Sequence, residues 1–279
     1  MRLSIHGLAA RHPSAPASGA GSSPALKPLS LAIESGEQVA VVGPSGAGKT
    51  TLLHALACAL KPVEGRFELD GVDPWSLPVA QLQKLRGRLF LAPQAPPLPP
   101  RQRVITAVLA ARLPQQSLAA SLRSLFYPTH IAQAEAALAR FDLAGKLWER
   151  VDRLSGGERQ RVGLARALVS AARLWLVDEP LSSLDPSRAA LAIETLTSAA
   201  RERGVTLVAS LHQVEVATRF ARVLGMREGV LQFDLPGAEV GRERLAALYA
   251  QHEHELLGPA PGLADSHAEG PRPAAMHCR

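Results

Sequence analysis

A glycine-rich stretch at residues 43–50 has residue types and a spacing that could bind phosphate. It follows four apolar residues and reads Gly-x-x-x-x-Gly-Lys-Thr, the pattern of a P-loop. Glycines let the backbone approach phosphate oxygens, and turned amides at a helix start attract anions. Lys49 would place its ammonium between β- and γ-phosphates, and the Thr50 hydroxyl would bind Mg²⁺. The residues expected at the phosphates are Gly43, Pro44, Ser45, Gly46, Ala47, Gly48, Lys49, Thr50 and Thr51.

Two adjacent carboxylates, Asp178 and Glu179, directly follow a second apolar stretch at residues 174–177. A carboxylate at the end of a buried strand is the second requirement of a P-loop site, and Asp178 would hold Mg²⁺ directly or through water. Consecutive residues at a strand end point to different sides. Glu179 can therefore polarise a water molecule in line with the γ-phosphate while Asp178 serves the metal.

A second candidate anion site lies at residues 154–158, Leu-Ser-Gly-Gly-Glu. Ser155 and Glu158 have the spacing of a capping box, which marks the start of a helix. Gly156 and Gly157 would expose backbone amides at that helix start. One chain has no evident need for two such sites on one triphosphate. The economical arrangement is a head-to-tail pair, in which this site of each copy closes on the nucleotide of the other.

The elements that must position these residues alternate between apolar strands and amphipathic helices, which predicts a mostly parallel, three-layer α/β core. Prolines mark an extended connector at 93–100, and Pro114 and Pro128 interrupt an alanine-rich helical stretch from 104 to 150. Strands are expected at 1–8, 28–33, 39–42, 66–69, 88–92, 174–177, 205–210, 223–226 and 230–233; helices are expected at 49–60, 154–171, 186–203, 213–222 and 241–257.

The domain organisation follows from these elements. We expect one domain over residues 1–257, with a core at about 1–94 and 172–257 and an inserted helical subdomain at about 95–171. Residues 12–25 are expected to form a flexible loop by composition. Residues 258–279 have the composition of a disordered tail.

Composition excludes some classes of function. The net charge of +6 arises from scattered basic residues, and the aromatic content of 4% is too low for base-stacking platforms, so no nucleic-acid partner is expected. No apolar run approaches the ~18 residues of a membrane span. The first residues have no apolar signal-peptide core. Cys58, in a helical pattern, and Cys278, in a polar tail, fit a reduced compartment. The chain is therefore expected in the cytosol.

Six motifs in a fixed order make the chain resemble the ATP-binding subunit of ABC transporters over roughly residues 1–257. Such a set is highly specific, because P-loop kinases or GTPases would show the first motif and lack the full set. The motifs are Gly43–Thr50 (Walker A), Gln94 (Q-loop), Leu154–Glu158 (signature), Asp178-Glu179 (Walker B with the catalytic Glu), Ser182–Asp185 (D-loop) and His212 (H-loop).

The resemblance implies roles for these residues. Gln94 would sense Mg²⁺ and couple to membrane subunits, and His212 would contact the γ-phosphate as a catalytic residue beside Glu179 and Lys49. Asp185 would organise the dimer contact. The metal would be held by Thr50, Gln94 and Asp178, whereas Ser155, Gly156 and Gly157 would bind the ATP of the partner copy.

The resemblance also implies an architecture and an assembly. The fold would be a RecA-like P-loop core with an N-terminal antiparallel β portion and an inserted α-helical subdomain. ATP and Mg²⁺ would be the cofactors. The partners would be a second copy of the chain, integral membrane permease subunits and, indirectly, a solute-binding protein. The chain would then lie at the cytoplasmic face of the inner membrane as a peripheral protein.

The cargo is indicated by a finer resemblance. Residues 210–217, Ser-Leu-His-Gln-Val-Glu-Val-Ala, are similar to the corresponding stretch of phosphonate importer ATPases, as are residues 110–113 and 121–126. This implies uptake of phosphonate or a related oxyanion such as phosphite. The chain departs from the wider family at His12, where an aromatic residue commonly stacks on adenine, and at Ser183, where Ala is frequent.

Alternative functions remain open at this stage. The chain could serve another cargo, or be an accessory, ATPase-like component of a phosphonate-degrading complex. A soluble ABC-type ATPase of nucleic-acid maintenance would usually carry a long coiled coil or a second ATPase unit, and the sequence shows neither. A non-hydrolysing subunit is disfavoured because Lys49, Asp178, Glu179 and His212 are all present.

Overall fold

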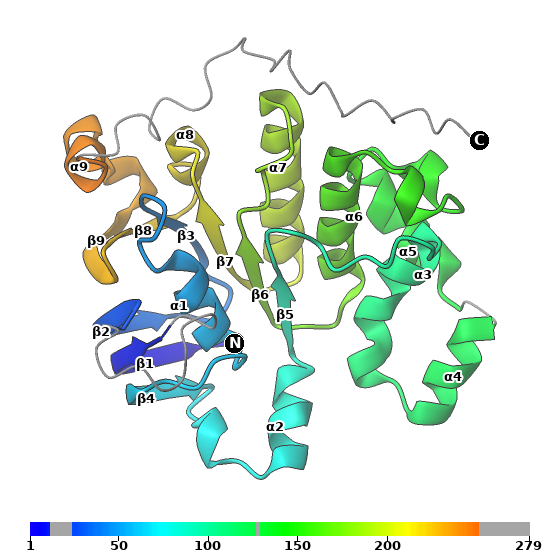
Figure 1. Ribbon diagram of the computed structural model, residues 1–279, viewed down its shortest axis with the longest axis horizontal. Helices are drawn as coiled ribbons and strands as arrows, with labels where there is room; N and C mark the ends of the chain where they lie inside the picture. The colour runs from blue at the N-terminus through cyan, green and yellow to red at the C-terminus, as the bar shows by residue number, and fades with distance from the viewer. Residues whose placement is uncertain (12–23, 127–128, 251–279) are drawn as a thin grey trace, which may run out of the picture.

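The computed structural model of the chain describes residues 1–11, 24–126 and 129–250 (Figure 1). Two sheets and the helices packed on them account for most of this part of the chain. The elements are β1 (Leu3–Ala10), β2 (Leu26–Ile33), β3 (Gln38–Val42), α1 (Lys49–Leu56), β4 (Glu64–Leu69), α2 (Val79–Arg86), β5 (Leu89–Ala92), α3 (Val104–Leu109), α4 (Leu118–Phe126), α5 (Ile131–Ala139), α6 (Gly156–Val169), β6 (Leu174–Asp178), α7 (Pro186–Glu202), β7 (Thr206–Leu211), α8 (Val214–Ala217), β8 (Arg222–Arg227), β9 (Val230–Pro236) and α9 (Arg242–Leu248).

The larger sheet has six strands in the order β5-β6-β7-β3-β8-β9. All neighbours pair in parallel except β8 and β9, which form an antiparallel hairpin. The central strands β3, β6 and β7 are buried along their whole length, as expected for parallel strands covered on both faces. In β3, Val39 and Val41 join one hydrophobic cluster while Ala40 and Val42 join the other.

The two hydrophobic clusters correspond to the two covered faces of this sheet. One contains α1 and the antiparallel sheet β2-β1-β4, and the other contains α6 and α7. Figure 1 shows β1, β2 and β4 beneath α1 at one side of the molecule. The predicted three-layer, mostly parallel α/β core with an N-terminal antiparallel portion is confirmed.

The helices α3, α4 and α5 lie between β5 and β6 in sequence and on the far side of α6 from the sheet centre (Figure 1). Pro114 lies in a short 3₁₀ segment, Ala110–Gln115, that follows α3, as its predicted helix-breaking role requires. The predicted break at Pro128 lies outside the described residues. The subdomain limits of 95 and 171 stay a prediction, because α3, α5 and α6 share one hydrophobic cluster with α7 and the sheet.

Three expected elements differ from the structure. The helix after the P-loop ends at Leu56, so Cys58 is not helical: its φ is +54°, and the amides of Ala59 and Leu60 both donate to the His54 carbonyl. A left-handed residue of this kind closes a helix. The helix expected at 213–222 covers only Val214–Ala217. The last helix is Arg242–Leu248, and residues beyond 250 lie outside the described part.

Two further differences concern exposure and coverage. The strand β5, which the sequence predicts as a buried strand at 88–92, is half-buried over most of its length because it forms the edge of the sheet. Residues 12–23 and 251–279, which include His12, Cys278 and the predicted tail, are outside the described residues. Among the helices that are described, none has the length and apolar character needed to cross a membrane.

Candidate functional site

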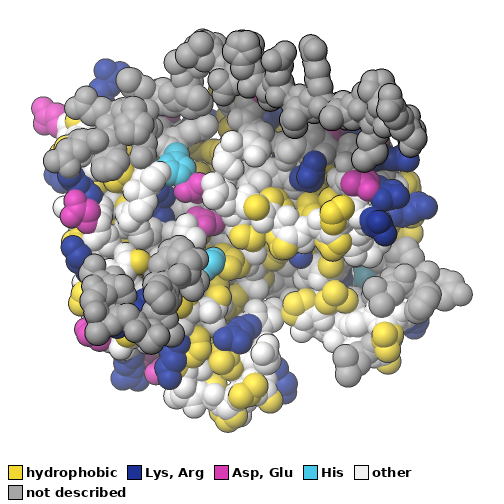
Figure 2. All heavy atoms as spheres, in the orientation of Figure 1, with side chains coloured by type: hydrophobic (Ala, Val, Ile, Leu, Met, Phe, Trp, Pro, Cys, Tyr) yellow, Lys and Arg dark blue, Asp and Glu magenta, His cyan; other side chains and the backbone are white. Residues whose placement is uncertain are grey.

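The predicted site residues meet at one edge of the six-stranded sheet. The P-loop follows β3, Asp178 ends β6, His212 follows β7, and Gln94 follows β5. These four strands run parallel, so their carboxyl ends lie at the same edge, where ligands bind in open α/β sheets. Figure 2 shows histidine and acidic side chains close together near the middle of the visible face, beside hydrophobic side chains.

The P-loop is shaped by glycines that no other residue could replace without strain. Gly43 has a φ of +152° and Gly48 a φ of +96°. A Cβ on Gly43 would lie 2.0 Å from the carbonyl oxygen of Met226, and one on Gly48 would lie 2.8 Å from that of Ala25. The chain therefore turns tightly between β3 and α1, and α1 begins at Lys49. Its first amides face the predicted phosphate position.

Lys49 is held within this loop. Its Nζ donates to the carbonyl of Gly43 at 2.7 Å and to that of Pro44 at 3.1 Å. The side chain is only 4% exposed. A buried ammonium needs such partners, and a phosphate oxygen entering the loop would offer it a stronger, charged acceptor.

The end of β6 carries the two predicted carboxylates, which point to different partners. Asp178 is 3% exposed and its Oδ1 accepts a 2.6 Å hydrogen bond from the Ser210 hydroxyl. Glu179 has a φ of +45°, a left-handed conformation that is uncommon outside glycine. This turn carries its side chain away from Asp178 and toward β5 and the end of β7.

The Glu179 carboxylate contacts two other predicted residues, His212 and Gln94. Its Oε1 lies 2.5 Å from Nε2 of His212, and its Oε2 accepts a 2.7 Å hydrogen bond from Nε2 of Gln94. The hydrogen bond from His212 lowers the pKa of Glu179, opposed by burial and aided by the charges of His212 and Lys49. The carboxyl group is therefore ionised at neutral pH, as a proton acceptor must be.

The signature residues form the predicted helix start. The Ser155 hydroxyl accepts the Glu158 amide at 3.2 Å, and the Glu158 carboxylate accepts the Ser155 amide at 2.7 Å, which completes a capping box. The Ser155 amide lowers the pKa of Glu158. Ser155 and Gly156 are exposed, whereas Gly157 packs against the D-loop: a Cβ there would lie 2.9 Å from the Ser183 carbonyl.

This helix start does not join the P-loop of its own chain. Figure 1 places α6 and α1 on opposite sides of α7. Ser155 and Glu158 bond to each other and Glu158 also pairs with Lys146, whereas Lys49 bonds to the carbonyls of Gly43 and Pro44. The structure thus brings together Lys49, Asp178, Glu179, Gln94 and His212 and leaves Ser155, Gly156 and Gly157 elsewhere.

Comparisons with known proteins identify this arrangement. The family model described as ABC transporter matches residues 26–182, more than half of the chain. The chain belongs to the ABC transporter family. This confirms the resemblance that the six sequence motifs indicated.

Curated relatives are similar over the full length of the chain. The chain is 64% identical to a protein named phosphonates import ATP-binding protein PhnC 2 from Albidiferax ferrireducens, covering 100% of both chains. It is 63% identical to a phosphonates import ATP-binding protein PhnC from Polaromonas sp., again over 100% of both chains. A relative from Pseudomonas aeruginosa, named phosphonates import ATP-binding protein PhnC 1, is 50% identical over 91% of this chain and 92% of its own.

Solved structures of ABC proteins share the fold. One, described as a dimeric post-hydrolysis state of an ATP-binding cassette bound to ADP and Pi, is 26% identical, with a TM-score of 0.72 over 85% of this chain and 100% of that chain. A second, part of an ABC transporter complex from Clostridium perfringens, is 24% identical, with a TM-score of 0.70 over 91% of this chain and 98% of that one. At that identity it shows the fold alone.

Two residues at this ABC site were missed by the sequence argument. The hydroxyl of Ser210 accepts the amide of Glu179 at 2.9 Å in addition to binding Asp178. The hydroxyl of Tyr249, which is 0% exposed, accepts the amide of Gly43 at 3.2 Å. Ser210 is a polar residue near the end of a mostly apolar strand, β7, and this pattern could have indicated a role at the site. No local pattern pointed to Tyr249, which lies 206 residues from its partner.

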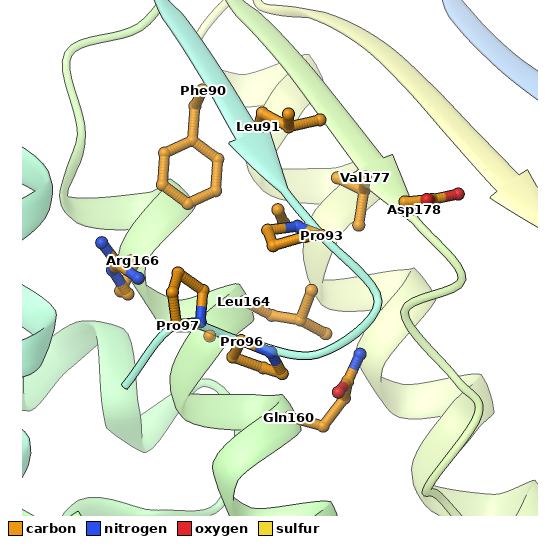
Figure 3. A pocket seen from close by; sticks show the side chains of 12 residues that line it. Phe90, Leu91, Pro93, Pro96, Pro97, Gln160, Leu164, Arg166, Val177 and Asp178 are labelled. Atoms are coloured by element: carbon orange, nitrogen blue, oxygen red, sulfur yellow. The ribbon is translucent and has the colours of Figure 1, made fainter. Parts of the chain in front are cut away.

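The connector that carries Gln94 packs directly on the signature helix. Figure 3 shows Pro93, Pro96 and Pro97 facing Gln160, Leu164 and Arg166 of α6, with Asp178 at the edge of the same pocket. The connector approaches the helix backbone closely at Gly163, where a Cβ would lie 2.8 Å from Cβ and Cγ of Pro96. Burial lowers the pKa of Arg166. The Q-loop connector of this ABC protein therefore packs directly on α6, the helix that begins at the signature residues.

Proposed function

We propose that the chain is the ATP-hydrolysing subunit of a phosphonate import system. The observation that carries the hydrolytic role is the Glu179 carboxylate, ionised and held between Gln94 and His212 at the edge of the sheet that carries the P-loop. The cargo is supported by the names of the relatives that are 63–64% identical over their full length. A related phosphorus oxyanion such as phosphite belongs to the same proposal.

The loop from Gly43 to Thr51 would cradle the phosphates of ATP. Its tight glycine turns leave room for backbone amides to approach the phosphate oxygens. Lys49, now bound to the Gly43 and Pro44 carbonyls, would move its hydrogen bonds to the β- and γ-phosphates. The resulting contacts would neutralise charge as the γ-phosphoryl group transfers.

The residues at the end of β6 fit a magnesium ion that is completed by nucleotide. Asp178 is buried with one oxygen already bound to Ser210, and Thr50 is half-buried at the start of α1. Within the described part of the chain no group of three or more His, Cys, Asp or Glu residues could hold a metal alone. Mg²⁺ is typically held by one or two carboxylates plus phosphate oxygens. Thr50, Asp178 and Gln94 would hold it, and it would neutralise phosphate charge.

Hydrolysis would depend on Glu179 and His212. Glu179 would orient or deprotonate the attacking water, because its lowered pKa keeps a proton acceptor available at neutral pH. Gln94 would bind the metal through its amide oxygen, because its amide nitrogen donates to the Glu179 carboxylate. His212 would turn from Glu179 to the γ-phosphate, so nucleotide binding would rearrange this three-residue cluster.

The signature residues would act on the ATP of a second copy. Ser155 and Gly156 are exposed and lie away from the P-loop of their own chain, and a solved relative of the fold is described as dimeric. A head-to-tail dimer would close two composite sites. Closure would act through the Gln94 connector on integral membrane permease subunits, with a solute-binding protein delivering cargo. The dimer would lie peripherally at the cytoplasmic face of the inner membrane.

The direct test is ATP turnover by purified Glu179→Gln. Loss of a general base should reduce turnover by about 10²–10⁴-fold while ATP binding is retained, because the P-loop is unchanged. The matched control is Glu202→Gln, which removes a carboxylate paired with Arg140 on the exposed side of α7 and should turn over like the wild type. Undiminished turnover in Glu179→Gln would refute the assigned role, and absence of turnover in the wild type would refute the ATPase itself.

A further inference from the structure

We propose that Ser210 is a positioning residue that sets both the metal-binding carboxylate and the catalytic carboxylate of this site. The inference rests on the proposed ATPase function and deepens it. Ser210 lies near the carboxyl end of β7, directly opposite Asp178 in the parallel pairing of β6 with β7. Parallel neighbours at that register bring the Ser210 side chain beside the strand end that carries Asp178 and Glu179.

The hydroxyl of Ser210 makes two hydrogen bonds whose directions are fixed by chemistry. The amide of Glu179 can only donate, so the hydroxyl oxygen accepts it at 2.9 Å. The single hydroxyl proton then goes to Oδ1 of Asp178 at 2.6 Å. Ser210 is 0% exposed, so solvent cannot readily take over either contact. One atom therefore ties the two adjacent carboxylate residues to the neighbouring strand.

The contact with Asp178 determines how this carboxylate can face a metal ion. The hydrogen bond from the hydroxyl to Oδ1 restrains rotation of the carboxylate, so that Oδ2 would be the oxygen offered to a metal ion. Hydrogen bonds to the back of a metal-binding carboxylate set its orientation, and losing one typically costs about 10–100-fold in metal affinity or activity. Removing the Ser210 hydroxyl should weaken Mg²⁺ binding by about that factor.

The contact with Glu179 holds an unusual backbone conformation. Glu179 has a φ of +45°, which is costly for a residue with a side chain. Its amide would be left without this buried acceptor if the hydroxyl were removed. This conformation turns the Glu179 carboxylate to Gln94 and His212. Ser210 therefore positions both Asp178, which would bind the metal, and Glu179, which would accept the proton.

The experiment compares Ser210→Ala with a matched control on the same strand. Thr206→Val removes another fully buried hydroxyl of β7, which accepts the Gly36 amide and donates to the Met1 carbonyl at the opposite end of the strand. Each full-length chain is saturated with a non-hydrolysable ATP analogue and titrated with Mn²⁺, detected by electron paramagnetic resonance. The Mg²⁺ dependence of ATP turnover and the thermal unfolding of each variant are measured in parallel.

We expect Ser210→Ala to weaken Mn²⁺ binding and to raise the Mg²⁺ concentration for half-maximal turnover by about 10–100-fold. Its affinity for the nucleotide in EDTA should remain within about twofold of the wild type, because the P-loop keeps its contacts. Thr206→Val should lower thermal stability without changing the metal dependence. Ser210→Thr, which retains the hydroxyl, should restore metal affinity to near the wild-type value.

Two results would overturn the inference: metal affinity in Ser210→Ala close to that of the wild type, or equal weakening in Ser210→Ala and Ser210→Thr. If Ser210→Ala does not fold, Ser210→Thr alone decides, because an intact hydroxyl must preserve the metal affinity. Failure of the proposed function is distinct, since it would appear as a wild-type chain that neither binds the nucleotide analogue nor hydrolyses ATP.

Discussion

The contact between the Gln94 connector and the signature helix can be tested by adding one methyl group. In Gly163→Ala the new Cβ would lie 2.8 Å from Cβ and Cγ of Pro96, whereas carbon atoms in contact lie about 3.5–4.0 Å apart. The proline ring, or the helix, must therefore move by about 1 Å. Overpacking of this kind costs about 1–3 kcal/mol.

The opposing effect is the helix propensity of alanine, which exceeds that of glycine by about 1 kcal/mol. The net expectation is a loss of between about 0 and 2 kcal/mol in the free energy of unfolding. Because Pro96 lies two residues from Gln94, displacement of the connector should also reduce ATP turnover. Urea denaturation and steady-state turnover of the purified variant measure both effects.

The matched control is Gly145→Ala, because a Cβ there would meet nothing within 4 Å. It should leave stability unchanged or slightly raised, and turnover unchanged. In a double-mutant cycle, Pro96→Gly should relieve the strain of Gly163→Ala and give a coupling energy within the range of about 0.5–3 kcal/mol seen for residues in contact. A Gly163→Ala variant that is more stable than the wild type by about 1 kcal/mol would refute the close packing at this point.

Three further results are expected. Lys49→Ala and Ser155→Ala chains should each be inactive, and mixing them should recover ATP turnover, because a mixed dimer contains one intact composite site; no recovery would contradict that site. The hydrogen bond from His212 holds the pKa of Glu179 below its usual 4.5. The ionised carboxylate of Glu179 therefore stabilises the folded state at pH values above 4.5. This contribution is lost as pH falls through the lowered pKa, so the stability advantage of the wild type over Glu179→Gln should shrink below pH 4.5; an advantage independent of pH would be contrary evidence. Burial raises the pKa of the Cys58 thiol to about 12, so Cys58 should resist thiol reagents at pH 8 until the chain unfolds, as peptide mapping would show.

Much of the fold could be predicted because local signals and topology agreed. The apolar strands alternated with helices, and parallel strands bring their carboxyl ends to one edge. Gln94, Asp178 and His212 lie at or just after the ends of such strands and therefore share this edge, as the roles that the family resemblance implied for them require. The capping box of Ser155 and Glu158 is formed within a single turn of helix, so the sequence alone could predict it.

Other features depend on contacts that the sequence does not encode locally. The role of Ser210 follows from the register of β7 against β6, and that of Tyr249 follows from the packing of a distant segment on the P-loop. The helix after the P-loop ends early because Cys58 adopts a left-handed conformation, which apolar periodicity cannot reveal. The hydrogen bonds of Glu179 with Gln94 and His212 likewise join residues that are far apart in the sequence, so no local pattern could predict them.

The most direct test of phosphonate import driven by ATP hydrolysis is uptake of a labelled phosphonate. Cells that lack this subunit would carry the wild-type chain, Glu179→Gln or the control Glu202→Gln, with unlabelled phosphonate, phosphate and phosphite as competitors. We predict that uptake is restored by the wild type and by Glu202→Gln, is absent with Glu179→Gln, and is competed most strongly by phosphonate or phosphite. Uptake by Glu179→Gln at the wild-type rate, or restored uptake that only phosphate competes, would contradict the proposed function.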